Sequence, residues 1–194
     1  MTETEKKAVG RYLDWHTGIL LETDGKMGIY RKESGKLIYK EKADSEDGYL
    51  GMYLFLMGKY LEKTEGTDLS EYWKKGISLA LKKIQSLMQD GITQVSEENT
   101  TVYLMDNLEV WKGLYELEYA GLKDVQAVSE MRKKLQAQIE KLFWDGANQR
   151  WRIIGNSDLY HQAEFYPDGV AQIYPLIYEF PVKEKKKQKN CSMF

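Results

Sequence analysis

The stretch GYLGMYLFLMGKYL, residues 48–61, decides the fold, because a helix with this sequence is apolar almost all the way round and must be buried on most sides. Asp47 stands at its entry, where a carboxylate suits the positive N-terminal end of a helix. Two later stretches repeat this order: Asp106 before LEVWKGLYELEYAG (residues 108–121), and Asp168 before VAQIYPLIYEF (residues 170–180). We therefore predict three buried helices that each begin with an aspartate.

Helices of a second kind are predicted between the buried ones, with one apolar and one charged face. They run from about Glu3 to Leu21, from Asp68 or Ser70 to Gln89, and from Asp124 to Phe143. Each is followed by an Asp-Gly pair: Asp24-Gly25, Asp90-Gly91 and Asp145-Gly146. The alternation predicts an inner set of helices that is covered by an outer set.

Two sets of landmarks recur along the chain with a similar spacing. The aspartates Asp47, Asp106 and Asp168 are 59 and 62 residues apart, and the Asp-Gly pairs are 66 and 55 residues apart. A self-similar period of this kind indicates a repeat of helical hairpins, each burying its apolar face on its neighbour. The alternative is coincidence among helix caps in an ordinary all-α protein.

Short β segments are predicted between outer and inner helices. Residues 27–42 are typical of a hairpin around the turn Glu33-Ser34-Gly35, and residues 92–103 and 151–154 contain further β-like pieces. All three segments lead into an inner helix. We therefore expect them on the face where the inner helices begin, beside Asp47, Asp106 and Asp168.

The composition limits the kinds of partner. A net charge of -2 gives no reason to expect nucleic acid, and no apolar run reaches the ~18 residues of a membrane span. The N-terminal residues lack the apolar core of a secretory signal, which predicts a cytoplasmic protein. One cysteine, Cys191, and two separated histidines, His16 and His161, give no metal site, and no cofactor motif is present. We expect one domain over residues 1–180 and a lysine-rich, disordered tail over 181–194.

The helix entries resemble those of the six-hairpin glycosidase superfamily, the (α/α)6 toroids. The resemblance lies in ADSEDGY at 43–49, MDNLEVWKGL at 105–114 and FYPDGVAQIYP at 165–175, and in the outer-helix ending LFWD at 142–145 before Arg150-Trp151. It covers about residues 5–180. It implies an all-α, toroid-like array of about three helical hairpins with short β excursions, where a full toroid has about six. On that reading the chain is a truncated product or a half-toroid.

Glycoside hydrolysis, which the resemblance implies, needs two carboxyl groups about 5 to 9.5 Å apart. The predicted catalytic residues are Asp47, Asp106 and Asp168, with Asp47 and Asp106 as the preferred pair. Aromatic rings suit sugar faces and amides suit sugar hydroxyls, so the predicted substrate-binding residues are Asp44, Tyr49, Glu109, Trp111, Tyr166 and Gln172. The alternative is structural: each aspartate caps its helix, and Tyr49 and Trp111 belong to the core.

Three functions remain open from the sequence. The first is a glycoside hydrolase-like protein acting on or binding an oligosaccharide or polysaccharide, either active or inactivated by truncation. The second is a non-catalytic carbohydrate-binding protein, and the third is a helical interaction scaffold. Because inner helices this apolar would leave sticky open edges, we also expect a homo-oligomer that covers them.

Overall fold

The computed structural model describes residues 1–65, 69–120, 125–155, 157 and 165–182, which form a mostly helical protein. The helices are α1 (Glu3–Glu22), α2 (Glu46–Thr64), α3 (Glu71–Leu87), α4 (Leu104–Tyr119), α5 (Val125–Phe143), the π-helical turn η1 (Phe165–Gly169) and α6 (Val170–Ile177). The strands are β1 (Gly28–Glu33), β2 (Lys36–Lys42), β3 (Met88–Gln89), β4 (Ile92–Thr93), β5 (Trp144–Asp145) and β6 (Arg150–Trp151).

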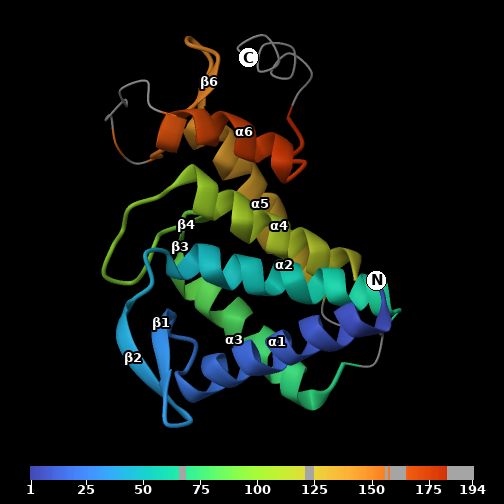
Figure 1. The fold of residues 1–194 in the computed structure, drawn as a ribbon. Coiled ribbons are helices and arrows are strands. Elements are labelled where there is room, and N and C mark those ends of the chain that lie inside the picture. The colour runs from blue at the N-terminus through green and yellow to red at the C-terminus, as the bar shows by residue number, and fades with distance from the viewer. Residues whose placement is uncertain (66–68, 121–124, 156, 158–164, 183–194) are drawn as a thin grey trace.

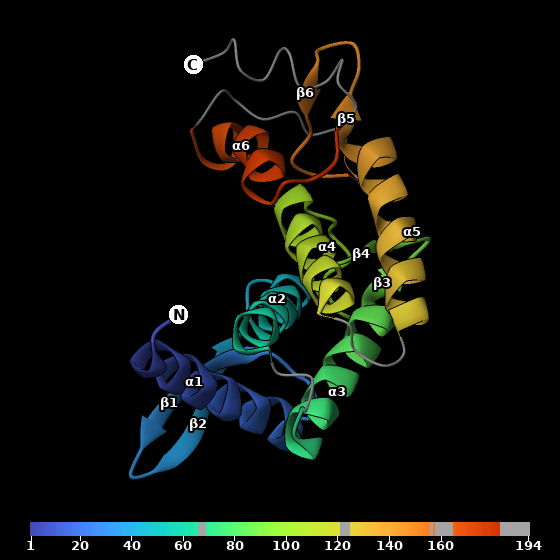
Figure 2. The same cartoon turned by 90° about the vertical axis from the view of Figure 1, so that its right-hand side faces the viewer.

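Helices α2 to α5 form the two predicted layers, whereas the third predicted buried helix, α6, is short and leaves Leu176 and Ile177 exposed. Helices α2, α4 and α6 follow one another along one side, and α3 and α5 cover α2 and α4 from the other (Figure 2). The amphipathic helix α3 buries Ile77, Ala80 and Ile84, while α5 buries Leu135 and Ile139. Helix α1 packs on α2 and α3 at one end of the molecule, and α6 lies at the opposite end (Figure 1).

The most extensive contact between elements joins α2 to α4, and glycines make it possible. A Cβ on Gly113 would lie 2.2 Å from the carbonyl oxygen of Gly51, and a Cβ on Gly51 would lie 2.6 Å from the backbone nitrogen of Val110. At the far end a Cβ on Gly58 would lie 2.7 Å from Glu116. The backbones therefore touch along the length of the two helices, which run parallel. We call this contact the glycine seam.

Each β piece is a two-stranded antiparallel ribbon between an outer and an inner helix. The hairpin predicted at 27–42 is confirmed as β1 and β2. The piece predicted at 92–103 is shorter than expected: Ile92 pairs with Gln89 across a two-residue turn, Asp90-Gly91. Both turn residues have positive φ, 51° and 85°, as a type I′ hairpin turn requires.

The entry of α2 agrees with the sequence, which offers Asp44 or Ser45 as the N-cap, whereas the expected Asp106-Asn107 cap of α4 is wrong. Helix α2 is capped by Ser45, whose Oγ accepts from the N–H of Gly48, so Asp47 lies inside the first turn. Helix α4 starts at Leu104 without any side-chain cap, which places Asp106 in the first turn and Asn107 beyond it. The aspartates are thus not the caps of these helices, and their carboxyl groups are available for other contacts.

No helix of the described residues is long and apolar enough to cross a bilayer. The predicted disordered tail falls almost entirely on residues 183–194, which lie outside the described residues.

Candidate active site

Asp47 is held in a buried polar network where α2 and α4 begin. Its side chain is fully buried, with Oδ1 accepting from Ser45 Oγ at 2.9 Å and Oδ2 accepting from Thr93 Oγ1 at 2.7 Å. Burial raises the pKa of Asp47, while the hydrogen bonds from Thr93 and Ser45 oppose this shift. Both carboxylate oxygens are occupied, so Asp47 cannot reach a bound molecule and acts through its neighbours.

Thr93 and Asn107 complete this network and were not predicted from the sequence. The fully buried Asn107 side chain accepts from the Thr93 N–H at 2.9 Å and donates to the carbonyl oxygens of Thr93 at 3.0 Å and Tyr103 at 2.8 Å. Strand β4 is thereby tied to the first turn of α4. Since Thr93 also contacts Asp47, one residue joins the entries of both inner helices.

Asp106 and Glu109 are the two acids that the first turns of α4 present beside Asp47. Burial, then the charges of Asp47 and Glu109, raise the pKa of Asp106 to about 8. Burial also raises the pKa of Glu109 to about 7, against a hydrogen bond from Tyr178, and Asp47 and Asp44 add to the shift. A carboxyl group that keeps its proton near neutral pH can serve as a general acid.

Glycine also creates the space for Glu109. A Cβ on Gly48 would lie 2.6 Å from Glu109 Oε2 and 2.7 Å from Ser45 Oγ. No larger residue can occupy position 48 of α2 without displacing one of these oxygens. The glycine seam thus reaches the acidic side chains. The glycines that let α2 and α4 pack closely also leave room for Glu109.

The C-terminal part of the chain brings two tyrosines to the acids. The Tyr178 hydroxyl lies 3.4 Å from Glu109 Oε1 and 3.6 Å from Met52 Sδ, so it links α2 and α4 to the end of α6. Tyr174 packs edge to face on Tyr178 at 5.3 Å between ring centroids. Burial raises the pKa of Tyr174, and Glu109, Tyr166 and Asp106 add to this. Tyr174 and Tyr178 are four residues apart, a helical spacing that is visible in the sequence, but our site prediction included neither residue.

The nine predicted site residues fall into three groups. The structure brings together Asp44, Asp47, Asp106 and Glu109: the charges of Asp44 and Asp47 raise the pKa values of Asp106 and Glu109. Tyr49 is 44% exposed near the start of α2, and the exposed Tyr166 acts on Tyr174, so both rings remain available to a ligand.

Three predicted site residues have other positions or partners. Trp111 is 2% exposed and packs on Phe180 and Tyr115, so it belongs to the core and cannot stack on a sugar. Gln172 is committed to the backbone of Trp151, accepting from its N–H at 2.8 Å and donating to its carbonyl at 2.9 Å. Asp168 lies in the turn η1 before α6, and no contact between its carboxyl group and Asp106 or Glu109 is seen among the described residues.

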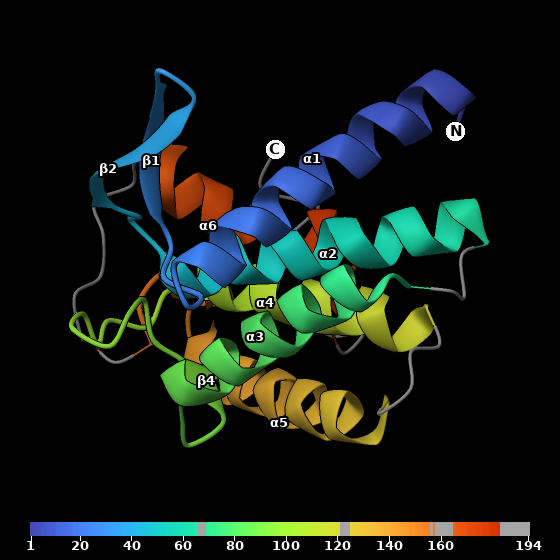
Figure 3. The ribbon, with the colours of Figure 1, turned by 90° about the horizontal axis from the view of Figure 1, so that it is seen from below.

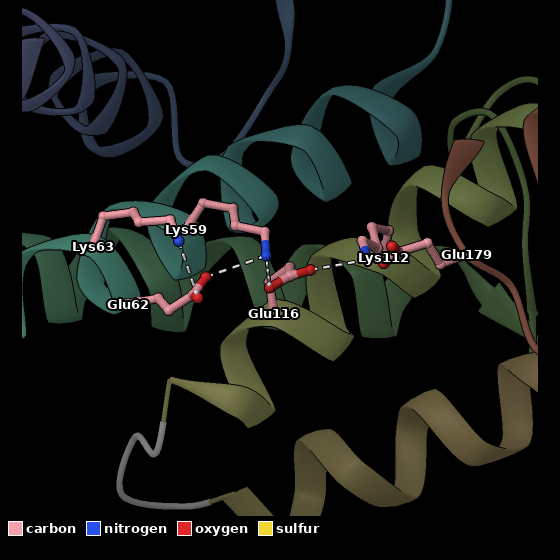
Figure 4. A network of polar contacts seen from close by, with 6 residues as sticks. All are labelled: Lys59, Glu62, Lys63, Lys112, Glu116 and Glu179. Atoms are coloured by element: carbon pink, nitrogen blue, oxygen red, sulfur yellow. Dashed lines mark hydrogen bonds and ion pairs between the residues drawn. The ribbon is translucent and has the colours of Figure 1, made fainter. Parts of the chain in front are cut away.

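A chain of ion pairs lies further along α2 and α4, toward their C-terminal ends (Figure 4). Glu116, 2% exposed, lies 2.9 Å from both Lys112 Nζ and Lys59 Nζ, and Lys112 also lies 3.0 Å from Glu179. Since Glu179 follows Tyr178, the pair with Lys112 holds the end of α6 against α4. It thereby supports the position of the Tyr178 hydroxyl over Glu109.

The described residues contain no group of three or more His, Cys, Asp or Glu side chains placed to share a metal ion. Neither the models of known protein families nor the curated proteins include a match to this chain.

Chemically, the arrangement offers a protonated acid, Asp106, one helical turn from a second acid, Glu109, with tyrosine rings beside them. Side chains three positions apart on a helix have Cβ atoms about 5 to 6 Å apart, so the two acids occupy neighbouring positions on α4. Burial, with the charge of Asp47 adding to it, raises the pKa of Asp106 and so favours its protonated form. This combination suits proton transfer to a leaving oxygen.

Proposed function

We propose that this chain is a glycosidase-like protein of the α/α-toroid type, contributing three helical hairpins and acting on an oligosaccharide. The observation that carries the proposal is the convergence of Asp106 and Glu109, with raised pKa values, beside Tyr174 and Tyr178. The alternating inner and outer helices and the ribbons at the inner-helix entries support the toroid-like arrangement.

In this proposal Asp106 is the general acid. It holds a proton at neutral pH and delivers it to the glycosidic oxygen as the bond breaks. Glu109, whose pKa of about 7 leaves it partly ionised, is the second carboxyl group and acts as base or nucleophile. Asp47, which belonged to the preferred catalytic pair of the sequence analysis, has no catalytic role in this proposal, because its side chain is buried. Its charge adds to the raised pKa of Asp106.

The test compares the protein with Asp106→Asn, Glu109→Gln and the matched control Asp90→Asn. Asp90 lies in the β3–β4 turn with φ 51°, a conformation that asparagine adopts readily, so this control changes a charge without straining the fold. We expect hydrolysis of a panel of neutral oligosaccharides to fall at least 100-fold in both site variants. Binding to a glycan array should persist, and Asp90→Asn should behave as the unchanged protein.

Two outcomes separate the alternatives. Saccharide binding without hydrolysis in the unchanged protein would replace the enzyme by a carbohydrate-binding protein, which the exposed Tyr49 and Tyr166 rings favour. Neither binding nor hydrolysis across the panel would leave only the helical scaffold and overturn the proposal.

A further inference from the structure

A groove lies between three helices at the opposite end of α2 from the acids. Its walls come from α1, the C-terminal part of α2 and the start of α3, where α1 diverges from α2 toward its own N-terminus (Figure 3). Its volume is about 700 Å³, within the range of about 300 to 1,000 Å³ that protein sites for small molecules occupy. Tyr60, which lines the groove, comes 13 residues after Asp47 on α2, a distance of about 20 Å along the helix axis. We call this second site the α1 groove.

Two aromatic side chains line the α1 groove, and specific contacts hold both of them. The Trp73 indole N–H donates to Asp14 Oδ1 at 2.8 Å, which ties α3 to α1. Tyr60 packs edge to face on Trp73 with 5.4 Å between ring centroids, and Gly10 leaves room for its hydroxyl, since a Cβ there would lie 3.2 Å away. The two rings are therefore preorganised and only partly buried, as a surface that receives another flat ring requires.

The α1 groove is also lined by three bases and two acids, all from α1. Lys6 pairs with Glu3 at 3.0 Å, and the Asp14 carboxylate accepts the indole hydrogen bond. Lys7 and Arg11 are exposed, stand four positions apart on one face of α1, and make no ion pair with any described residue. The groove therefore offers an ammonium and a guanidinium group beside two aromatic rings, in a chain whose formal net charge is -2.

We propose that the α1 groove binds a small aromatic anion. Its ring lies against Tyr60 and Trp73, and Lys7 and Arg11 hold its carboxylate, phosphate or sulfate group. A guanidinium presents parallel N–H donors that match the oxygens of such groups, and the lysine adds a second positive charge. A neutral ring would gain only the aromatic contacts, and a bare anion only exposed ion pairs, which are weak in water. The proposal does not depend on the proposed hydrolysis, and the failure of one leaves the other intact.

Isothermal titration calorimetry of the full chain measures the binding of two aromatic anions, phenyl phosphate and indole-3-carboxylate. Phenol, indole and inorganic phosphate separate the contribution of the ring from that of the charge. We expect the aromatic anions to bind with a Kd below about 1 mM, at least about tenfold more tightly than the neutral rings or inorganic phosphate. Added salt should weaken this binding, because it screens the exposed cations. Amide NMR shifts on binding should gather in α1 and around Tyr60 and Trp73.

Two variants that change the charge of the groove in opposite directions give the sharper test. Arg11→Gln removes a cation and should weaken the binding of both aromatic anions at least about fivefold. The matched control, Arg31→Gln, changes an exposed arginine of the β1–β2 hairpin and should leave binding unchanged. Asp14→Asn removes an acid but keeps an oxygen that can accept from the Trp73 indole, so binding should tighten about threefold. Circular dichroism checks that the variants are folded.

Several results would each overturn the α1 groove as a site for aromatic anions. One is that neither aromatic anion binds the unchanged protein at millimolar concentration, and another is that phenol binds as tightly as phenyl phosphate. Equal weakening by Arg11→Gln and Arg31→Gln would show that the anion is not held in the groove. Weaker anion binding in a folded Asp14→Asn protein, or amide shifts confined to other helices, would contradict the assigned contacts.

Discussion

The two ends of the α2–α4 helix pair both hold buried acidic side chains, but only the C-terminal end pairs them with lysines. Toward the C-terminal end the buried Glu116 is matched by Lys112 and Lys59 at 2.9 Å. At the N-terminal end Asp47, Asp106 and Glu109 lie together without a lysine or arginine among the main groups that shift their pKa values. Compensated charge is what a stable core requires, whereas uncompensated acids lower stability and are typical of functional sites.

The largest effect should come from breaking the scaffold that both ends share. Gly113→Ala places a Cβ 2.2 Å from the Gly51 carbonyl oxygen, so α2 and α4 must separate. We expect a loss of about 3 kcal/mol or more in the free energy of unfolding, and a melting temperature about 10 °C lower. Thermal and urea unfolding measure this. The control is Gly146→Ala, whose Cβ meets nothing closer than 3.9 Å; equal effects of the two would contradict the seam.

A change confined to the compensated end should rank second. Glu116→Gln keeps the shape of the side chain and removes its charge, which leaves the buried Lys112 dependent on the exposed Glu179. We expect a loss of about 2 to 3 kcal/mol by urea unfolding. Glu62→Gln, on the solvent-facing arm of the same network, should leave the urea unfolding curve nearly unchanged. If both variants unfolded like the unchanged protein, the network would have no role in stability.

A change confined to the acid end should have the opposite sign. The folded pKa of Asp106 is about 8, far above its usual 3.8, so stability falls as pH rises between these values, when the unfolded chain ionises first. Asp106→Asn removes this loss, and we expect it to stabilise the protein by at least about 1 kcal/mol at pH 9. At pH 4 the difference should nearly vanish. Melting curves across this range provide the check, and destabilisation at pH 9 would show that Asp106 is a structural residue.

The smallest effect is expected at the hydrogen bond between the Tyr178 hydroxyl and Glu109. Tyr178→Phe removes the hydroxyl that favours ionised Glu109, so the pKa of Glu109 should rise further by about half a unit. Carbon-13 NMR titration of the Glu109 carboxyl group measures the shift, and stability should change by less than about 1 kcal/mol. Tyr174→Phe is the matched control, because no hydrogen bond from its hydroxyl to Glu109 is seen among the described contacts. A lowered pKa in Tyr178→Phe would contradict the assigned contact.

The sequence predicted the helices well because apolar periodicity over 15 to 20 residues is a strong local signal. It could not tell which face of an inner helix is buried, since 108–121 is apolar all round. For this reason Trp111 was placed in the site although it lies in the core, while Tyr178 was missed. The acids Asp106 and Glu109 were found because they interrupt an apolar stretch at its start.

Contacts between distant segments were beyond the sequence. Thr93 belongs to no sequence motif, and only folding brings its hydroxyl 2.7 Å from Asp47 and 2.8 Å from Asn107. The glycine seam was different, because Gly48, Gly51 and Gly58 stand in the very stretch that decided the fold. Their helical spacing could have indicated a close helix contact, although not its partner Gly113.

The glycine seam also predicts the order in which segments of the protein unfold locally. Backbone amides along Gly51–Gly58 and Val110–Gly113 sit where two helices touch, so water reaches them only when the helices come apart. We expect these amides to exchange their hydrogens most slowly, with the β1–β2 ribbon and α6 exchanging sooner. The first turns of α2 and α4 then keep their acids in register even while the two ends of the molecule fluctuate.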